Sequence, residues 1–313
     1  MAGIRVAVIG AGHFGRFHAQ KVAAAPGAVL AAVHDRNPDR TAQVAAETGA
    51  LAAPTARAAI EAAEAVIVAT PTGTHHAIAA AALDAGRHVL VEKPITTTLA
   101  EADDLVRRAK RAGRVLQVGH LERFSAARGA ITRHVSRPLL IECVRLSPFR
   151  PRGLDVSVVL DLMIHDIDLA LMLAGGMPTA IEANGAAVRS GRADVALARL
   201  GFADGRVAFL SASRIAPAIT RTLRLAGADG TLEADLVGRS LRAVGTDDAA
   251  AVTENWAEAD SLAAQFAGFL AALRGEAPVA VDGEAGRAAL AVALAIEERI
   301  EASAAAALAS GLL

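Results

Sequence analysis

The stretch 155–169 carries ionisable residues inside an apolar sequence. Asp161, His165 and Asp168 are spaced i, i+4 and i+7, and the residues around them are mostly valine, leucine, isoleucine and methionine. Read as an α-helix, this spacing places the three side chains on one face. Because ionisable groups in apolar surroundings are costly unless they are paired or used, this face predicts an acid/base site. A histidine titrates near neutrality, so His165 is suited to take the proton of a hydroxyl group.

A glycine-rich turn predicts a second part of the site. The segment from Gly10 to Gly15 has the form G-x-G-x-x-G and lies between an apolar run and a helical pattern. Gly10 allows the tight turn, Gly12 lets a pyrophosphate approach the backbone, and Gly15 lets helix and strand pack closely. The amide groups at the helix N-terminus then bind phosphates. We therefore expect a dinucleotide here, with His13 and Phe14 beside it.

Asp35 ends the second predicted strand, where a carboxylate can accept hydrogen bonds from the adenosine ribose. Its negative charge repels a 2′-phosphate, so the predicted cofactor is NAD rather than NADP. The adjacent Arg36 belongs to the same cofactor-binding set and is the residue that would serve a 2′-phosphate. His18, further along the first helix, is interpreted as a packing residue or as a neighbour of the phosphates.

Two more loops are expected beside the nicotinamide. One begins with Thr70-Pro71 and reaches His75, and the other contains Glu92-Lys93. Each follows a predicted strand, and the carboxyl ends of the strands face the ligand in open α/β sheets. The proline directly after Lys93 restricts the backbone, which favours a side chain fixed towards the ligand over an ordinary surface lysine.

The elements that must position these residues follow two patterns. Up to about residue 118, short apolar strands alternate with helical segments, which predicts a doubly wound parallel sheet. These strands are expected at 4–10, 29–35, 65–69, 89–91 and 115–118. After the helix with Asp161, strand-like runs follow one another without helices, which predicts an open, mostly antiparallel sheet. They are expected at about 179–189, 194–201, 206–214, 220–226 and 231–244, before two helices near 258–274 and 283–309.

The change of pattern predicts an α/β protein with two domains. Residues 1–122 are expected to form an NAD-binding Rossmann domain. Residues 123–313 are expected to form an α/β domain for substrate binding and oligomerisation, whose last helix can pack back on the first domain. A chain of 313 residues is long enough for both cores.

The composition excludes several classes of protein. A net charge of −1 provides no basic field for nucleic acid or an anionic membrane. Neither a membrane-spanning run nor a secretory signal is found in the sequence, so a cytoplasmic location is expected. The absence of tyrosine excludes a tyrosinate mechanism. Cys143 is the one cysteine, which excludes a zinc site of several thiolates and favours a core residue, and no metal is expected.

Four segments together resemble the glucose-fructose oxidoreductase/inositol dehydrogenase/MocA family. They are the glycine-rich turn, the loop 69–75, the segment 85–94 with its Glu-Lys-Pro, and the Asp161/His165/Asp168 helix. The resemblance spans essentially the whole chain and implies a Rossmann domain followed by a domain whose open sheet commonly forms an oligomer interface, and hence a homodimer or homotetramer. It also implies that Lys93, Asp161 and His165 are the catalytic residues.

Segments 118–124, 141–149 and 155–166 are similar to the UDP-N-acetylglucosamine 3-dehydrogenase branch of that family. The branch oxidises the sugar C3 hydroxyl to a ketone, which a downstream aminotransferase aminates for a diamino sugar of lipid A. The resemblance implies a UDP-sugar substrate. Arginine side chains near the domain boundary could bind its diphosphate through paired hydrogen bonds. The expected substrate-binding residues are Lys93, His120, Arg123, Arg145, Arg152 and His165, with Arg150 as a further arginine. Ser125-Ala126 departs from the Asn-Pro usual in the branch, which leaves the exact nucleotide sugar open.

The catalytic roles and the function keep alternatives open. Either His165 is the general base, oriented by Asp161, while Lys93 holds the reacting oxygen, or Lys93 is the base and His165 binds the hydroxyl. Asp168 either orients a neighbour or only caps locally. The alternative functions are a dehydrogenase of another sugar or of inositol, an NAD-dependent glycosidase, and a non-catalytic NAD-binding regulator.

Overall fold

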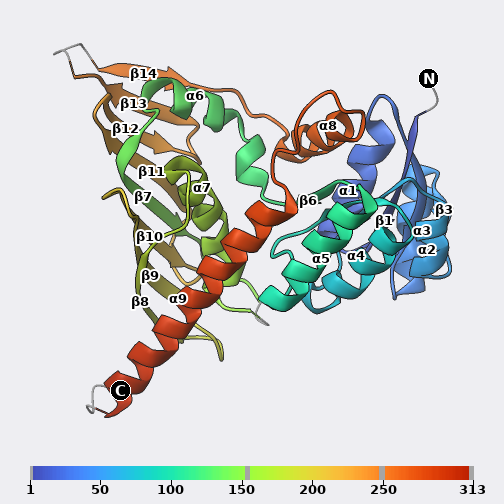
Figure 1. Cartoon of the computed structure of the whole chain (residues 1–313), viewed down its shortest axis with the longest axis horizontal. Coiled ribbons are helices and arrows are strands. Elements are labelled where there is room, and N and C mark those ends of the chain that lie inside the picture. The colour runs from blue at the N-terminus through green and yellow to red at the C-terminus, as the bar shows by residue number, and fades with distance from the viewer. Residues whose placement is uncertain (1–2, 152–155, 247–250, 310–313) are drawn as a thin grey trace. The chain divides into compact units, whose positions relative to one another are not determined.

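The computed structural model describes residues 3–151, 156–246 and 251–309 (Figure 1). Its contacts divide the chain into two compact units. Unit 1 comprises residues 1–124 and 260–287, and unit 2 comprises residues 125–259 and 288–313. Residues 260–287, which the sequence placed in the second domain, thus cluster with unit 1, while the domain boundaries themselves stay a prediction. Within the described ranges, no helix has both the length and the apolar character needed to cross a membrane.

Unit 1 is built on a six-stranded parallel sheet of order β3-β2-β1-β4-β5-β6, as predicted. Its strands are β1 (Ile4–Ile9), β2 (Ala28–His34), β3 (Leu51–Ala52), β4 (Ala65–Val68), β5 (His88–Val91) and β6 (Leu116–Val118). The strand order reverses between β1 and β4. In doubly wound sheets the ligand binds at the carboxyl ends of the strands around this reversal.

The helices of unit 1 are α1 (His13–Ala24), α2 (Pro38–Thr48), α3 (Ala56–Glu61), α4 (His75–Asp84), α5 (Leu99–Ala112) and α8 (Ser261–Leu273), with short 3₁₀ turns η1 (Thr72–Thr74) and η2 (Leu121–Phe124). Side chains cap the N-termini of α2, α3, α5 and α8, whereas no described side chain caps α1 or α4. Asn37 caps α2, and Thr98 with Glu101 forms a capping box on α5. Phe266 and Phe269 of α8 join the core that α1 and α2 form against the sheet.

Unit 2 is built on an eight-stranded sheet of order β14-β13-β12-β11-β7-β10-β9-β8. Its strands are β7 (Pro138–Leu146), β8 (Ala180–Ala186), β9 (Val195–Gly201), β10 (Val207–Ser213), β11 (Thr220–Gly227), β12 (Gly230–Asp235), β13 (Ser240–Val244) and β14 (Val252–Asn255). Only the β7/β10 pair among the described ladders of this sheet is parallel, so the predicted mostly antiparallel sheet is confirmed. Its helical elements are α6 (Ala126–His134), the π-helical turn η3 (Val159–Met163), α7 (Ile164–Ala174) and most of α9 (Gly283–Ala309).

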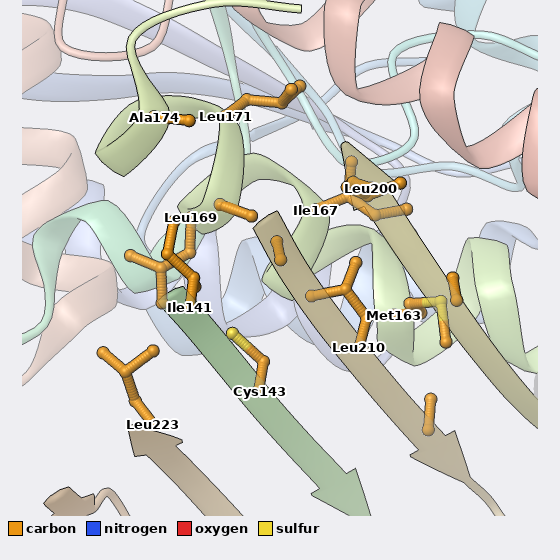
Figure 2. Packing of buried hydrophobic residues seen from close by; sticks show 14 of the residues in the cluster. Ile141, Cys143, Met163, Ile167, Leu169, Leu171, Ala174, Leu200, Leu210 and Leu223 are labelled. Atoms are coloured by element: carbon orange, nitrogen blue, oxygen red, sulfur yellow. The ribbon is translucent and has the colours of Figure 1, made fainter. Parts of the chain in front are cut away.

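One face of this sheet is covered and the other is open. Along β7, Ile141 and Cys143 point into the core, where they pack with Met163 of η3 and Ile167 of α7 (Figure 2). The interpretation of Cys143 as a core residue is confirmed, since its exposure is 2%. Because side chains alternate along a strand, Arg145 also lies on the covered face of β7, against the helices.

Candidate active site

The glycine-rich turn of unit 1 requires glycine at two of its three positions for steric reasons. Gly10 has a φ of +98°, and a Cβ on it would lie 2.4 Å from the Ala69 carbonyl oxygen. A Cβ on Gly15 would lie 1.7 Å from the Gly10 carbonyl oxygen, so α1 could not pack against the turn. At Gly12, by contrast, an added Cβ meets no described atom within 4 Å. The chain itself therefore gives no packing reason for glycine at this third position.

The space at Gly12 fits the pyrophosphate of a dinucleotide. Gly12 is the N-cap of α1, and no side chain of the described residues caps that terminus. The first turn of α1 contains no acidic residue either, so its amide groups and its dipole face an open position. A phosphate at this position would accept the uncapped N–H groups. Beside them, His13 and Phe14 are exposed, and their rings pack edge to face.

Asp35 joins the glycine turn to the end of β2. Its Oδ2 accepts a hydrogen bond from Ala11 N at 2.7 Å, and its Oδ1 accepts one from Asn37 N at 2.8 Å. The carboxylate is thus held at the edge of the turn, partly exposed, where it remains able to accept further bonds. The neighbouring Arg36 is exposed.

The loops after β4 and β5 are tied together by His75. This imidazole is 1% exposed, with Nδ1 2.9 Å from the Pro94 carbonyl oxygen and Nε2 2.8 Å from the Thr70 carbonyl oxygen. Both ring nitrogens therefore face the protein's own backbone. His75 positions the two loops, while Thr70 and Pro71 lie at the surface of theirs and can meet a ligand.

Glu92 and Lys93 occupy the loop after β5. The Glu92 carboxylate receives two contacts: His18 Nε2 lies 2.8 Å from Oε1, and Lys93 N donates to Oε2 at 3.3 Å. Burial alone would raise the pKa of Glu92, but the bond to His18 and the charge of Lys93 hold it below its ordinary value. A carboxylate thus stays ionised directly beside the partly buried Lys93.

The segment with Asp161 and His165 departs from the predicted regular helix. Residues 159–163 form a π-turn, in which Ile164 N donates to the Val159 carbonyl, and the α-helix starts only at Ile164. Ser157 caps this turn by accepting the Val159 amide at 3.1 Å. The α-helical spacing therefore does not continue through residue 163. Asp161 and His165 are partly exposed, whereas Asp168 is 1% exposed, so the three groups differ in burial, and their common face stays a prediction.

The residue next to His165 is anchored by a buried ion pair. Arg145 of β7 donates from Nε and Nη2 to the two carboxylate oxygens of Asp166, at 2.9 and 2.7 Å. The two side chains are 4% and 6% exposed. The guanidinium of Arg145 is therefore engaged with Asp166, while its expected contact with a diphosphate stays a prediction. Sequence reasoning missed Asp166, although the alternation Ile141, Cys143, Arg145 along β7 could have indicated an inward arginine.

A second buried ion pair holds the backbone that leads into the π-turn. Asp194 accepts from the amides of Val188, Arg189 and Ser190, and from Arg214 Nε at 2.8 Å. Burial would raise the pKa of Asp194, but these donors hold it far below its ordinary range. Arg214 also donates to the Val156 carbonyl at 2.9 Å. The start of the segment that presents Asp161 is thereby fixed to the sheet, another feature absent from the sequence prediction.

The remaining predicted substrate residues lie in different surroundings. His120, directly after β6, is 1% exposed, and Arg123 in η2 is partly buried with Nη1 3.5 Å from the Ala280 carbonyl oxygen. Arg150 is exposed, and Arg152 lies outside the described residues. Within the described ranges, no group of three or more His, Cys, Asp or Glu residues could hold a metal ion.

Comparison with known proteins agrees with this geometry. A family model described as the oxidoreductase family with NAD-binding Rossmann fold matches residues 4–120, and a GFO/IDH/MocA C-terminal domain model matches residues 111–233. UDP-N-acetylglucosamine 3-dehydrogenase from Acidithiobacillus ferrooxidans is 40% identical over 96% of this chain and 99% of its own length, and its solved structure matches with a TM-score of 0.91.

More distant relatives include an inositol dehydrogenase and a dehydrogenase of known structure. The scyllo-inositol 2-dehydrogenase (NAD(+)) of Bacillus subtilis is 30% identical over 68% of each chain. The solved structure of a probable dehydrogenase from Thermotoga maritima matches with a TM-score of 0.81 at 26% identity, covering 96% of this chain and 97% of the other.

Proposed function

This chain belongs to the GFO/IDH/MocA oxidoreductase family, and on that premise we propose that it oxidises the C3 hydroxyl of UDP-N-acetylglucosamine with NAD. The observation that carries the proposal is the 40% identity to UDP-N-acetylglucosamine 3-dehydrogenase over nearly the full length of both chains. The product would be the 3-keto sugar, which an aminotransferase would convert to an amino sugar for lipid A.

In unit 1 we assign the cofactor to the glycine turn and the adjoining loops. The amides after Gly12 would hold the pyrophosphate, and Asp35 would accept the ribose hydroxyls and repel a 2′-phosphate. Thr70 and Pro71 would border the nicotinamide, which when bound accepts the hydride from the sugar carbon. His75 and Glu92 act on the position of these loops rather than by touching the cofactor.

The reaction breaks the C3–H and O–H bonds of a secondary alcohol and forms a carbon–oxygen double bond. The hydride leaves with its electron pair, and the proton must pass to a base. We assign His165 as that base and Asp161 as the residue that orients it and stabilises its protonated form. Lys93 donates a hydrogen bond to the sugar oxygen and stabilises its developing negative charge.

The test is NADH formation from a panel of UDP-sugars, free sugars and inositols, with the ketone trapped by a coupled aminotransferase. We expect turnover with UDP-N-acetylglucosamine and a loss of about 10²- to 10⁴-fold in Lys93→Ala and His165→Ala. Lys110→Ala and His134→Ala replace a lysine and a histidine outside the assigned site and should keep parental turnover. If either site variant turned over normally with cofactor bound, its catalytic role would be rejected.

The panel also separates the alternative functions. Oxidation of inositols or free sugars without UDP-sugar turnover would favour the polyol dehydrogenases to which the chain is 30% identical. Glycan release without net NADH would indicate an NAD-dependent glycosidase. Cofactor binding with no turnover on any substrate would favour a regulator.

We further propose that the open face of the unit 2 sheet packs against a second copy of the chain. Leu140, Leu197 and Phe209 are 51%, 55% and 46% exposed. Arg224 lies among them between Glu142 and Glu233, so charges of both signs accompany the apolar area. Such a face is self-complementary about a two-fold axis. Light scattering should find a dimer or tetramer, and Phe209→Arg should dissociate it, whereas a monomeric parental chain would exclude this interface.

A further inference from the structure

An exposed arginine lies over an aromatic ring in unit 2. The guanidinium carbon of Arg189 lies 4.1 Å from the centroid of the Phe149 ring. Arg189 belongs to the loop between β8 and β9, and Phe149 to the segment that follows β7. Phe149 is partly buried, whereas Arg189 is exposed. In this stacked pair of Phe149 and Arg189, the ring therefore supports a guanidinium that a ligand can reach from solvent.

The backbone on both sides of the stacked pair is fixed by hydrogen bonds. The buried carboxylate of Asp194 accepts the amides of residues 188–190 through Oδ2, at 2.6 to 2.9 Å. On the other side, the Ser147 amide donates to the Ser213 carbonyl at 2.8 Å, and the Ala216 amide donates to the Ser147 carbonyl at 3.0 Å. None of these bonds uses a side chain of the stacked pair. Either side chain can therefore be replaced without removing the bonds that shape the loops.

The loop of Arg189 also contacts the segment that presents Asp161. The Val158 amide donates to the Ala193 carbonyl at 2.8 Å, and Val158 directly precedes the π-turn of residues 159–163. Ala193 lies in the same loop as Arg189. The stacked pair therefore belongs to the same part of unit 2 as the proposed catalytic segment.

The side chains around the stacked pair carry an excess of positive charge. Residues 147–151 and 187–194 contain one acid, Asp194, whose buried carboxylate is paired with Arg214. The same residues contain three arginines, which are Arg150, Arg189 and Arg192. A planar guanidinium stacks on flat π-systems and also attracts phosphate, and base stacking on aromatic rings and arginines is a common way to bind nucleotides. A ligand with a flat base and a diphosphate matches both properties.

We propose that Phe149 and Arg189 bind the nucleotide part of the substrate, with the base stacked on the Arg189 guanidinium and Phe149 supporting that guanidinium from the other side. The inference rests on the proposed function, which supplies a UDP-sugar as the substrate. It adds the residues that distinguish a sugar nucleotide from a free sugar or an inositol, neither of which carries a base. Because the diphosphate separates the base from the reacting sugar, this contact contributes to substrate affinity rather than to the chemical step.

The test measures the binding of UDP to the whole chain by isothermal titration calorimetry, with NAD present. Arg189→Lys keeps the positive charge but removes the planar group, so it should weaken UDP binding about tenfold or more. Phe149→Leu keeps an apolar side chain but removes the ring, and it should weaken UDP binding similarly. The double variant should bind little more weakly than the weaker single variant, because the two side chains act as a unit. Arg199→Lys, the matched control on β9, replaces an exposed arginine that pairs with Glu182 and should bind UDP like the parental chain.

The stacked pair is rejected if Arg189→Lys binds UDP as tightly as the parental chain, or if the parental chain does not bind UDP. Thermal unfolding checks that the variants are folded, and Arg189→Lys decides alone if Phe149→Leu does not fold. Turnover of UDP-N-acetylglucosamine with an unchanged KM in Arg189→Lys would reject this site and leave the proposed function standing. Binding of UDP through the stacked pair without oxidation of UDP-N-acetylglucosamine would reject the proposed substrate and leave this site standing.

Discussion

The buried ion pair between Arg145 and Asp166 gives the sharpest test of how His165 is held. Both side chains are at most 6% exposed and share two hydrogen bonds of 2.9 and 2.7 Å. Arg145→Met leaves the Asp166 carboxylate buried without its partner, which typically costs about 3–5 kcal/mol. Removing one charge from the pair between Arg199 and Glu182, whose side chains are 40% and 70% exposed, should cost no more than about 1 kcal/mol.

The assay is urea unfolding of each variant, combined with steady-state turnover. The double variant Arg145→Met/Asp166→Leu removes both charges, so it should be more stable than Arg145→Met alone. If the pair positions His165, turnover of the double variant should still fall by about 10²-fold, because misplacing a catalytic group by about 1 Å has that effect. If Arg145→Met lowered the free energy of unfolding by less than about 1 kcal/mol, the reasoning about the buried pair would be refuted. Full turnover in the double variant would refute the positioning role.

Three further predictions concern other parts of the molecule. Gly15→Ala should abolish folding, as measured by circular dichroism, because the added Cβ would clash with the Gly10 carbonyl oxygen. Gly12→Ala should keep the parental thermal midpoint but weaken NAD binding at least about tenfold, as measured by calorimetry. Asp35→Asn removes the charge that repels a 2′-phosphate, so the ratio of the NADP to the NAD dissociation constant should fall, and an unchanged ratio would contradict this assignment. The lowered pKa of Asp194 gives stability that is complete above its unfolded value of about 3.9 and is lost gradually as the pH falls towards its lowered folded value. The loss of urea midpoint in Asp194→Asn should therefore be largest at about pH 7 and should shrink steadily as the pH is brought below about 3.9.

Local sequence patterns predicted the kind of each sheet but not every strand: β3 and β14 were not expected, and the run 231–244 is two strands, β12 and β13. The apolar runs of unit 1 became β1, β2, β4, β5 and β6, since a parallel strand buried on both faces is apolar throughout. Two pairs of the predicted runs form antiparallel hairpins, β9/β10 around Gly205 and β11/β12 around Gly230, and both glycines adopt positive φ. The sequence analysis did not predict the helix α6, which lies between η2 and β7.

The π-turn at Asp161 shows where periodicity stops being informative. Apart from Asp161, its residues are apolar at a spacing that an α-helix also satisfies. The residues of the turn therefore do not decide between α-helical and π-helical hydrogen bonding. Ser157 caps the turn, and the Val158 amide donates to the Ala193 carbonyl. The second of these contacts depends on a residue just before β9, which comes later in the chain. A helical wheel drawn from residues 155–169 alone cannot contain that information, so it does not predict the π-turn.

The two proposed reactive side chains are supported in the same way within their own units. Lys93 follows Glu92, whose carboxylate is bound by His18 from α1, and His165 precedes Asp166, whose carboxylate is bound by Arg145 from β7. In each case the anchor is a sequence neighbour of the reactive residue, and its partner comes from a distant element. Both anchoring carboxylates are largely buried, whereas Lys93 and His165 are partly exposed. Motif spacing identifies the reactive residues, whereas the partners that hold them emerge only from tertiary packing.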